Sequence, residues 1–120
     1  MYCATVDALH LSPLSRPQEI LDIGTGTGIW AIEMADKYPN AQITGTDLSP
    51  IQPELVPPNC IFEIDDATLE WTWPRNHFDF VYIREMFGSV VDWPGLLREA
   101  YKCTKPGGYV EVVDHSTWPV

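Results

Sequence analysis

Three glycines at alternate positions, directly after an apolar run, constrain this chain more than any other feature. Residues 20–28 read Ile-Leu-Asp-Ile-Gly-Thr-Gly-Thr-Gly, so Asp22 is followed by Gly24, Gly26 and Gly28. Glycine adopts positive φ angles and lets a ligand approach the backbone where a Cβ would block it. An apolar run that ends in such a turn is typical of a strand leading into a ligand-binding loop. We therefore expect a buried strand with a ligand at its carboxyl end.

The spacing of the glycines distinguishes two classes of ligand. A dinucleotide-binding turn follows the pattern G-x-G-x-x-G, whose third glycine would fall on Ile29 here. This chain has G-x-G-x-G instead, with an acid two residues before the first glycine. The pattern makes a dinucleotide the second choice.

The rest of the chain alternates short apolar segments with turn-rich or helical ones, the pattern of an α/β domain with a mainly parallel sheet. Five strands are predicted, at residues 19–23, 42–46, 60–64, 78–83 and 108–113. Apolar residues at helical spacing predict helices at 28–38 and 94–103, and one helical turn at 6–9. The four prolines between residues 50 and 58 predict an irregular connection there, and any helix within 66–77 should be stunted.

Length and composition limit the class of protein. A chain of 120 residues forms one domain, which we place at 18–120 after an N-terminal segment at 1–17. With 45% hydrophobic and 20% charged residues, neither disorder nor a membrane span is indicated. The first eleven residues lack the features of a signal peptide, so we expect an intracellular protein, cytoplasmic or nuclear.

Charge and ligand-type residues exclude further classes. Seven Lys and Arg against 17 Asp and Glu give a formal charge of −10, so direct nucleic-acid binding is not expected. The three cysteines are too widely spaced for a disulfide framework or a C-x-x-C site. The three histidines share no ligand spacing with one another or with the cysteines, so no metal site is predicted.

An acid also ends the second predicted strand. The ends of the first two strands are neighbours in a doubly wound sheet, so the carboxylate of Asp47 can accept both hydroxyls of a ribose bound over the glycine turn. This role would serve the adenosine of either NAD or S-adenosylmethionine (SAM), and Leu48 would pack on the adenine. The alternative is that Asp47 caps the following turn.

Four segments together resemble the class I SAM-dependent methyltransferases. Residues 22–28 resemble motif I of that family, and similar segments follow in the family's order at Asp65-Asp66-Ala67, at 78–84 and at the Lys-Pro-Gly-Gly turn of 105–108. More narrowly, runs such as Gly-Thr-Asp-Leu-Ser-Pro-Ile-Gln-Pro resemble fungal methyltransferases related to secondary-metabolism regulators and velvet-complex partners. The resemblance implies a Rossmann-like fold with a five-stranded sheet of order 3-2-1-4-5, SAM as cofactor and S-adenosylhomocysteine as product.

The resemblance also implies which residues contact the cofactor. In the family, an acid before alanine after the third strand hydrogen-bonds the adenine amino group, so Asp66 is expected there, with Asp65 as the fallback and Ala67 beside them. The alternative for these acids is a solvated strand end. The end of the fourth strand would lie near the transferred methyl, and Arg84 would pair with the SAM carboxylate or form a surface salt bridge. The full expected set is Asp22, Gly24, Thr25, Gly26, Gly28, Asp47, Leu48, Asp65, Asp66, Ala67, Tyr82 and Arg84.

Methyl transfer is an in-line displacement, so the protein's main task is to align the reactants. A general base is needed only where the acceptor holds a proton that it does not lose unaided. Glu85 and His115 are the candidates, since each follows the carboxyl end of a predicted strand. A plain surface or packing role is the alternative for both. The acceptor, a small molecule or a protein, is not identified by the sequence.

The chain is short for this family, because the last two strands of the family's sheet have no counterpart here. The fifth strand would then be an exposed apolar edge, which favours pairing with another chain. Either the chain is a fragment of a longer protein, or a second copy or another protein covers this edge. In the second case we expect a homo-oligomer or a protein partner. An alternative function follows: a non-catalytic or partner-dependent interaction subunit with a methyltransferase fold.

Overall fold

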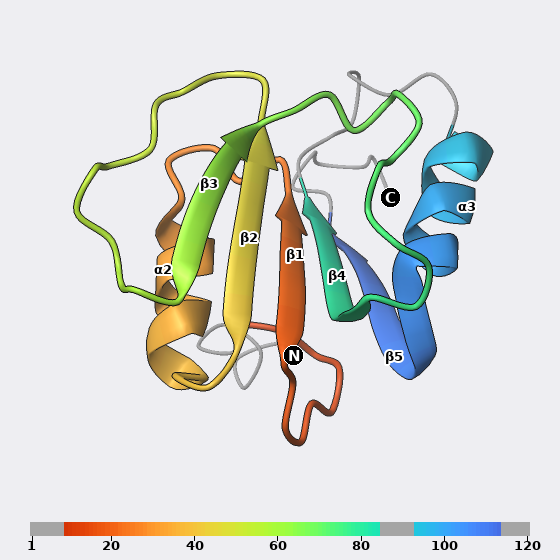
Figure 1. Cartoon of the computed structure of the whole chain (residues 1–120), viewed down its shortest axis with the longest axis horizontal. Helices are drawn as coiled ribbons and strands as arrows, with labels where there is room; N and C mark the ends of the chain where they lie inside the picture. The colour runs from red at the N-terminus through yellow and green to blue at the C-terminus, as the bar shows by residue number, and fades with distance from the viewer. Residues whose placement is uncertain (1–8, 85–92, 114–120) are drawn as a thin grey trace, which may run out of the picture.

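Five parallel strands form a single sheet of order β3-β2-β1-β4-β5 (Figure 1). The computed structural model describes residues 9–84 and 93–113. Its elements are β1 (Glu19–Ile23), α2 (Ile29–Lys37), β2 (Gln42–Asp47), β3 (Cys60–Ile64), β4 (Phe78–Arg84), α3 (Trp93–Cys103) and β5 (Thr104–Val113). The strand order confirms the predicted fold class, and each strand begins where the sequence predicted except β5.

β1 is the central strand, and it pairs with β2 on one side and β4 on the other. Its residues Ile20, Leu21 and Asp22 are completely buried. A parallel strand covered on both faces has to be apolar almost throughout, which is why an acid in this strand is informative. The carboxyl ends of the strands point to the top of Figure 1, and the glycine turn begins there.

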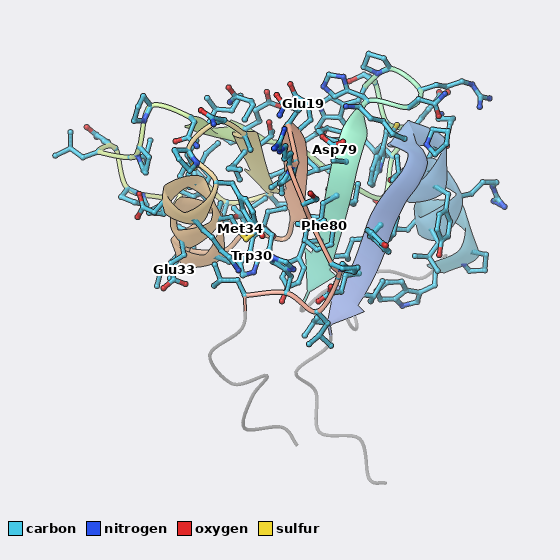
Figure 2. The ribbon with its side chains drawn as sticks, turned by 90° about the horizontal axis from the view of Figure 1, so that it is seen from below. Glu19, Trp30, Glu33, Met34, Asp79 and Phe80 are labelled. Carbon is cyan, nitrogen blue, oxygen red and sulfur yellow. The ribbon has the colours of Figure 1, made fainter. Side chains whose placement is uncertain are left out.

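α2 covers one face of the sheet. Its buried side chains Trp30 and Met34 pack with Phe80 of β4 in one hydrophobic cluster. Figure 2 shows both side chains directed from the helix toward the sheet, whereas Glu33 lies on the outer side of the helix. The spacing of apolar residues in α2 therefore matches the face that it buries.

A second cluster fills the opposite face of the sheet. Leu96 and Ala100 of α3 pack there with Val81 of β4. The connection between β3 and β4 contributes Trp71 to the same cluster and contains no helix, which is consistent with the prediction that any helix there would be stunted. The connection between β2 and β3 also has no helix, which agrees with its prolines.

The predicted start of the fifth strand was wrong. β5 begins at Thr104 rather than at residue 108, because α3 runs directly into the strand and Thr104 pairs with Phe78. The expected turn of Lys-Pro-Gly-Gly instead forms an irregularity inside β5, before Tyr109 pairs with Phe80. Gly107 adopts a φ of 87° in this irregularity. Most of the helical turn predicted at residues 6–9 lies outside the described residues.

Residues 9–12, here called the N-terminal strap, connect α2 to β5. The indole Nε1 of Trp30 donates to the carbonyl of Leu9 at 2.7 Å. The carboxylate of Glu111 accepts from the N–H groups of Leu11 and Ser12 at 3.0 Å each and from the Ser12 hydroxyl at 2.8 Å. The strap therefore joins the first turn of the helix to the edge of the sheet.

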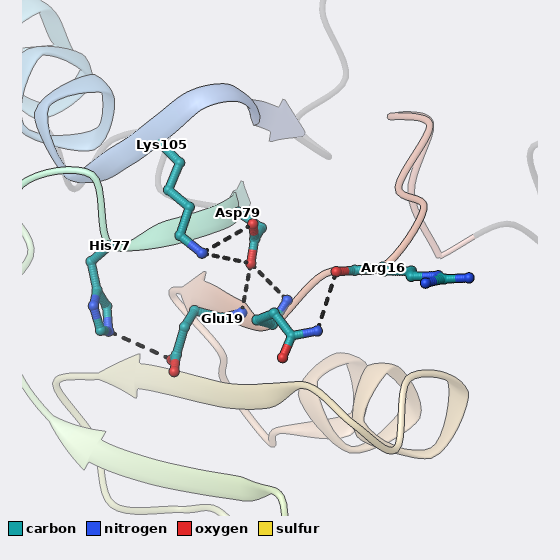
Figure 3. Close-up of polar contacts among 6 residues, drawn as sticks. Arg16, Glu19, His77, Asp79 and Lys105 are labelled. Atoms are coloured by element: carbon teal, nitrogen blue, oxygen red, sulfur yellow. Dashed lines mark hydrogen bonds and ion pairs between the residues drawn. The ribbon is translucent and has the colours of Figure 1, made fainter.

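An acid also organises the opposite, amino-terminal end of the sheet (Figure 3). Asp79 accepts from the N–H groups of Gln18 at 2.6 Å and Glu19 at 2.9 Å, and it pairs with Lys105 at 3.3 Å. Burial opposes ionisation, but these hydrogen bonds lower the pKa of Asp79 below its usual value. Asp79 therefore ties β1, β4 and β5 together at the end of the sheet away from the glycine turn.

Candidate cofactor site

A cavity of about 680 Å³ opens beside the carboxyl ends of β1, β2 and β3. In open α/β sheets, ligands bind outside the carboxyl ends of the strands. A volume of this size lies within the range of small-molecule sites. The cavity is lined by Ile23, Gly24, Thr25, Gly26, Thr27, Ile29, Thr46, Asp47, Leu48, Ile51, Asp65, Asp66, Ala67 and Thr68.

The glycine turn forms one wall of the cavity. Gly24, Gly26 and Gly28 have φ angles of 76°, 59° and 86°, in the left-handed region that favours glycine. The carbonyl of Thr46 in β2 accepts from the N–H groups of Gly24 at 3.0 Å and Thr25 at 2.9 Å. These two bonds fold the turn back over the end of β2.

Asp22 stabilises the glycine turn from its buried position in β1 and does not line the cavity. Its carboxylate oxygen Oδ2 accepts from the hydroxyl of Thr25 at 2.7 Å, and the side chain is completely buried. Thr25 lines the cavity, whereas Asp22 does not. The acid of the motif therefore acts on the site through Thr25.

Asp47 lies at the cavity and is oriented by two backbone groups. Its Oδ2 accepts from the N–H of Gly26 at 2.8 Å, and its Oδ1 accepts from the N–H of Ser49 at 3.2 Å. Gln52 connects the same two segments, because its side-chain amide donates to the carbonyls of Gly26 at 2.7 Å and Ser49 at 2.9 Å. The carboxylate is thus placed beside the glycine turn before any ligand binds.

The hydrogen bonds of the turn distinguish the two classes of ligand that the glycine pattern left open. A pyrophosphate is bound by N–H groups that point at it from a glycine turn and a helix N-terminus. Here the N–H groups of Gly24, Thr25, Gly26 and Gly28 all donate to acceptors within the protein. Three carboxylates also line the cavity, and among the described residues no lysine or arginine lines it. These four N–H groups are therefore not free to bind a pyrophosphate.

The segment after β3 supplies the other two carboxylates, those of Asp65 and Asp66. Asp66 Oδ1 accepts from the hydroxyl of Thr68 at 2.6 Å and from its N–H at 2.9 Å. These hydrogen bonds lower the pKa of Asp66, so the group remains ionised at neutral pH. The N–H of Asp65 donates to the carbonyl of Asp47 at 3.0 Å, which holds the ends of β2 and β3 together.

Exposed apolar side chains form the remaining part of the lining. Leu48, Ile51 and Ile29 are 66%, 60% and 61% exposed, although all three line the cavity. Large apolar side chains that remain exposed around a cavity are typical of a ligand site. Together with the carboxylates, they offer a flat apolar ligand both contact area and hydrogen-bond acceptors.

The predicted site residues divide into those that line the cavity and those that do not. The lining includes Gly24, Thr25, Gly26, Asp47, Leu48, Asp65, Asp66 and Ala67. The side chain of Tyr82 instead stacks on Trp30, with ring centroids 4.0 Å apart, and is 7% exposed. Any contact of Tyr82 with a ligand would therefore come from its backbone. The structure does not describe the side chain of Arg84. Glu85 and His115 lie outside the described residues.

Seven residues at this site were not among those predicted from the sequence: Ile23, Thr27, Ile29, Thr46, Ile51, Gln52 and Thr68. The position of Thr68, two residues after Asp66, was a usable signal, because Asp and Thr often form such turns. Ile51 and Gln52 lie in the proline-containing connection, where no periodic pattern marks a residue's direction. Only the tertiary structure brings them to the glycine turn.

These features agree with a match to a family of known proteins. The model of the family described as "Methyltransferase domain" matches residues 2–119, so the chain belongs to this family. Among curated relatives, it is 50% identical over 108 residues to the methyltransferase pytC of Aspergillus terreus, covering 88% of this chain and 33% of that protein.

Two further relatives carry regulatory names. The chain is 46% identical over 112 residues to the secondary metabolism regulator LAE1 of Cochliobolus heterostrophus, covering 88% of this chain and 36% of that protein. It is 39% identical over 109 residues to the protein-methionine methyltransferase laeA of Emericella nidulans, covering 90% and 29%. The chain thus spans about a third of the length of the curated relatives that it matches.

Solved structures agree with the fold. Phosphoethanolamine N-methyltransferase 2 of Haemonchus contortus, in complex with SAM, matches with a TM-score of 0.71 and 29% identity, covering 83% of this chain and 25% of that one. The [4+2]-cyclase SpnF matches with a TM-score of 0.72 and 27% identity, covering 82% and 39%. Within the described residues, no helix is long and apolar enough to span a membrane.

Proposed function

We propose that this chain binds SAM over its glycine turn and contributes the cofactor site of a methyltransferase. The observation that carries the proposal is the hydrogen bond between the Gly26 N–H and the carboxylate of Asp47, 2.8 Å long, at the cavity. This bond fixes the carboxylate beside the glycine turn, which supports its proposed role as the acceptor for the two hydroxyls of a ribose. It also occupies an N–H group that a phosphate would require.

The other lining residues fit the rest of an adenosine. Leu48 and Ile51 provide apolar area for the faces of the adenine, and Asp66 provides an acceptor for its amino group. In the part of the chain that the structure describes, three carboxylates and no lysine or arginine line the cavity, which suits a ligand that carries positive charge. These features favour SAM over the neutral or anionic nucleotides.

Once bound, the cofactor supplies an electrophilic methyl group on a positively charged sulfur. The residues of this chain bind and orient it: the turn through its backbone, Asp47 through its carboxylate, and Asp22 through Thr25. Alignment of this kind contributes roughly 7 to 11 kcal/mol to such reactions. The relatives named methyltransferase pytC and protein-methionine methyltransferase laeA support methyl transfer as the reaction of the whole protein, and the second name specifies a protein methionine as the acceptor for that relative.

Calorimetric titration with SAM and S-adenosylhomocysteine tests this proposal. We expect both to bind, and we expect Asp47→Ala to weaken binding at least about tenfold, or 1.4 kcal/mol. Asp47→Asn keeps an acceptor for the Gly26 N–H but removes the charge, so its affinity should fall between those of the wild type and Asp47→Ala. NAD serves as the contrasting ligand and should not bind. Folded protein that fails to bind SAM would contradict the proposal.

A second candidate function rests on β5. Among the described residues, β5 pairs only with β4, and its Tyr109 and Val112 are 40% and 44% exposed. Such an edge suits a subunit that acts through a protein partner. The structural relative SpnF is named a [4+2]-cyclase, so likeness to this fold alone does not establish methyl transfer. Binding of SAM without formation of S-adenosylhomocysteine when small-molecule and protein methyl acceptors are supplied, with or without candidate partners, would favour this alternative.

A further inference from the structure

One row of residues runs across all five strands beneath the glycine turn. Strand pairing aligns Phe62 with Gly45, Gly45 with Asp22, Asp22 with Tyr82, and Tyr82 with Glu111. Each of the four side chains in this row contacts a segment at the carboxyl end of the sheet. Asp22 holds Thr25, Tyr82 stacks on Trp30, and Glu111 holds the N-terminal strap.

Phe62, the member of the row on β3, lies directly against the third glycine of the turn. A Cβ placed on Gly28 would lie 2.5 Å from Cζ of the Phe62 ring and 2.9 Å from its Cε1. Carbon atoms do not approach one another so closely, because repulsion rises steeply below contact distance. The ring therefore fills the space that a side chain at residue 28 would need.

The second glycine of the turn has different surroundings. A Cβ on Gly26 would meet nothing within 4 Å, although Gly26 also has a positive φ and lines the cavity. Gly26 thus faces the ligand space, whereas Gly28 faces the protein. The motif needs its third glycine for packing against Phe62 as well as for backbone conformation.

Gly45 of β2 lets the ring approach from the other side. A Cβ there would lie 2.8 Å from Cδ1 of Phe62 and 2.8 Å from the hydroxyl oxygen of Thr25. Phe62 therefore lies between Gly45 in the sheet and Gly28, the N-cap residue of α2. It is also close to Thr25, whose hydroxyl donates to Asp22. Its ring acts as a spacer between the sheet and the turn.

We propose that Phe62 is a positioning residue for the cofactor, because the size of its ring sets the height of the glycine turn above β2. The Gly26 N–H lies two residues before Gly28 and bonds to Asp47, so a change in that height moves the turn relative to the carboxylate. The part of this inference that concerns the cofactor rests on the proposed function above. Phe62 acts through the turn and does not line the cavity.

The test compares Phe62→Leu with Phe78→Leu in the full 120-residue chain. Phe78 is 1% exposed, belongs to the opposite hydrophobic cluster and begins β4, at the other end of the sheet, so it controls for loss of aromatic area. We expect Phe62→Leu to weaken SAM binding about tenfold or more in calorimetry, and Phe78→Leu to lower the melting temperature without changing affinity for SAM. Equal SAM affinity in wild type and Phe62→Leu would overturn the inference.

A double-mutant cycle tests whether ring contact is the reason. Gly28→Ala introduces both the collision with the ring and the strain of a positive φ, whereas in the Phe62→Leu background only the strain remains. We therefore expect the double variant to bind SAM more tightly than Gly28→Ala alone. If the loss of SAM affinity in the double variant equals the product of the losses in the two single variants, the proposed contact between Phe62 and residue 28 is contradicted.

A third measurement separates this inference from the proposed function. Amide hydrogen exchange in the protein without ligand reports the Gly26 and Gly28 N–H groups, which bond to Asp47 and to the Thr25 carbonyl. Phe62→Leu should accelerate exchange at these two amides, and Phe78→Leu should not. If the wild type does not bind SAM, the proposed function fails while exchange still decides the role of Phe62. Unchanged exchange in Phe62→Leu would refute that role.

Discussion

Asp22 and Asp47 look alike in the sequence, since both lie at the end of a strand near the glycines, yet the structure gives them different tasks. Asp22 is buried and holds the hydroxyl of Thr25, whereas Asp47 lines the cavity beside Gly26. The difference follows from the register of the strands and the direction of each side chain. A residue type and its spacing predict that a carboxylate is needed, but not what it touches.

We expect His10 to make the stability of the fold depend on pH. In the neutral ring, Nδ1–H donates to the Ser12 carbonyl at 2.7 Å and Nε2 accepts from the hydroxyl of Tyr38 at 3.0 Å. Burial lowers the pKa of His10, and the charge of Lys37 acts in the same direction, whereas the Ser12 carbonyl and Glu111 oppose it.

The unfolded chain therefore binds a proton at His10 at higher pH than the folded chain does, so acidification through the usual histidine pKa destabilises the fold. We expect the melting temperature to fall as pH is lowered from about 7.5 to about 5.5, with a shallower fall in His10→Gln. Calorimetric scans across this range provide the measurement. Parallel profiles for the two proteins would mean that His10 does not contribute.

At the scale of elements, apolar periodicity predicted the strands and helices well, because burial on one or two faces determines it. It failed at β5, where pairing between Thr104 and Phe78 begins the strand before the Lys-Pro-Gly-Gly irregularity. A pattern of apolar residues carries no information about pairing across a bulge. The position of the N-terminal strap could not be predicted from apolar periodicity either. Hydrogen bonds to Glu111 and Trp30 keep the strap in place, and it has no periodic apolar face.

Glu111 should therefore contribute to stability through the strap. Glu111→Ala removes the acceptor of two backbone N–H groups and one hydroxyl, and we expect a loss of about 1–3 kcal/mol in the free energy of unfolding. Glu111→Gln, which retains one oxygen, should lose less. Denaturant titration gives the measurement, with the exposed Glu54→Ala as control. A loss for Glu111→Ala no larger than that for Glu54→Ala would show that the strap is not held by this carboxylate.

At the scale of the whole molecule, one end of the sheet carries the candidate cofactor site and the other is tied by Asp79 (Figure 3). This division follows from the parallel arrangement of the strands, which places all their carboxyl ends at one edge. The sheet also has two outer strands, and among the described residues β5 is paired on one side only. The expected partner or second copy at this strand remains a prediction.

Sedimentation velocity tests that prediction. We expect the 120-residue chain to form a dimer or a larger species, because the exposed side chains of Val112 and Tyr109 accompany an edge that can pair. Val112→Lys should shift the distribution toward monomer, since charge on an edge strand opposes pairing. A monomer at high protein concentration in the wild type would exclude self-association at β5 and leave a different protein partner to be sought.

The sequence by itself determined the strand segments, the glycine turn and the acids at the strand ends, because these depend on local backbone conformation and on which segments must be buried. The strand order was implied by the resemblance to the methyltransferases, and the tertiary structure agrees with it. The sequence also favoured a ligand other than a dinucleotide. The tertiary structure decided which acid faces the cavity, that the N–H groups of the turn bond within the protein, and that Phe62 supports Gly28. These features depend on register between strands distant in the sequence, and local preferences do not encode register.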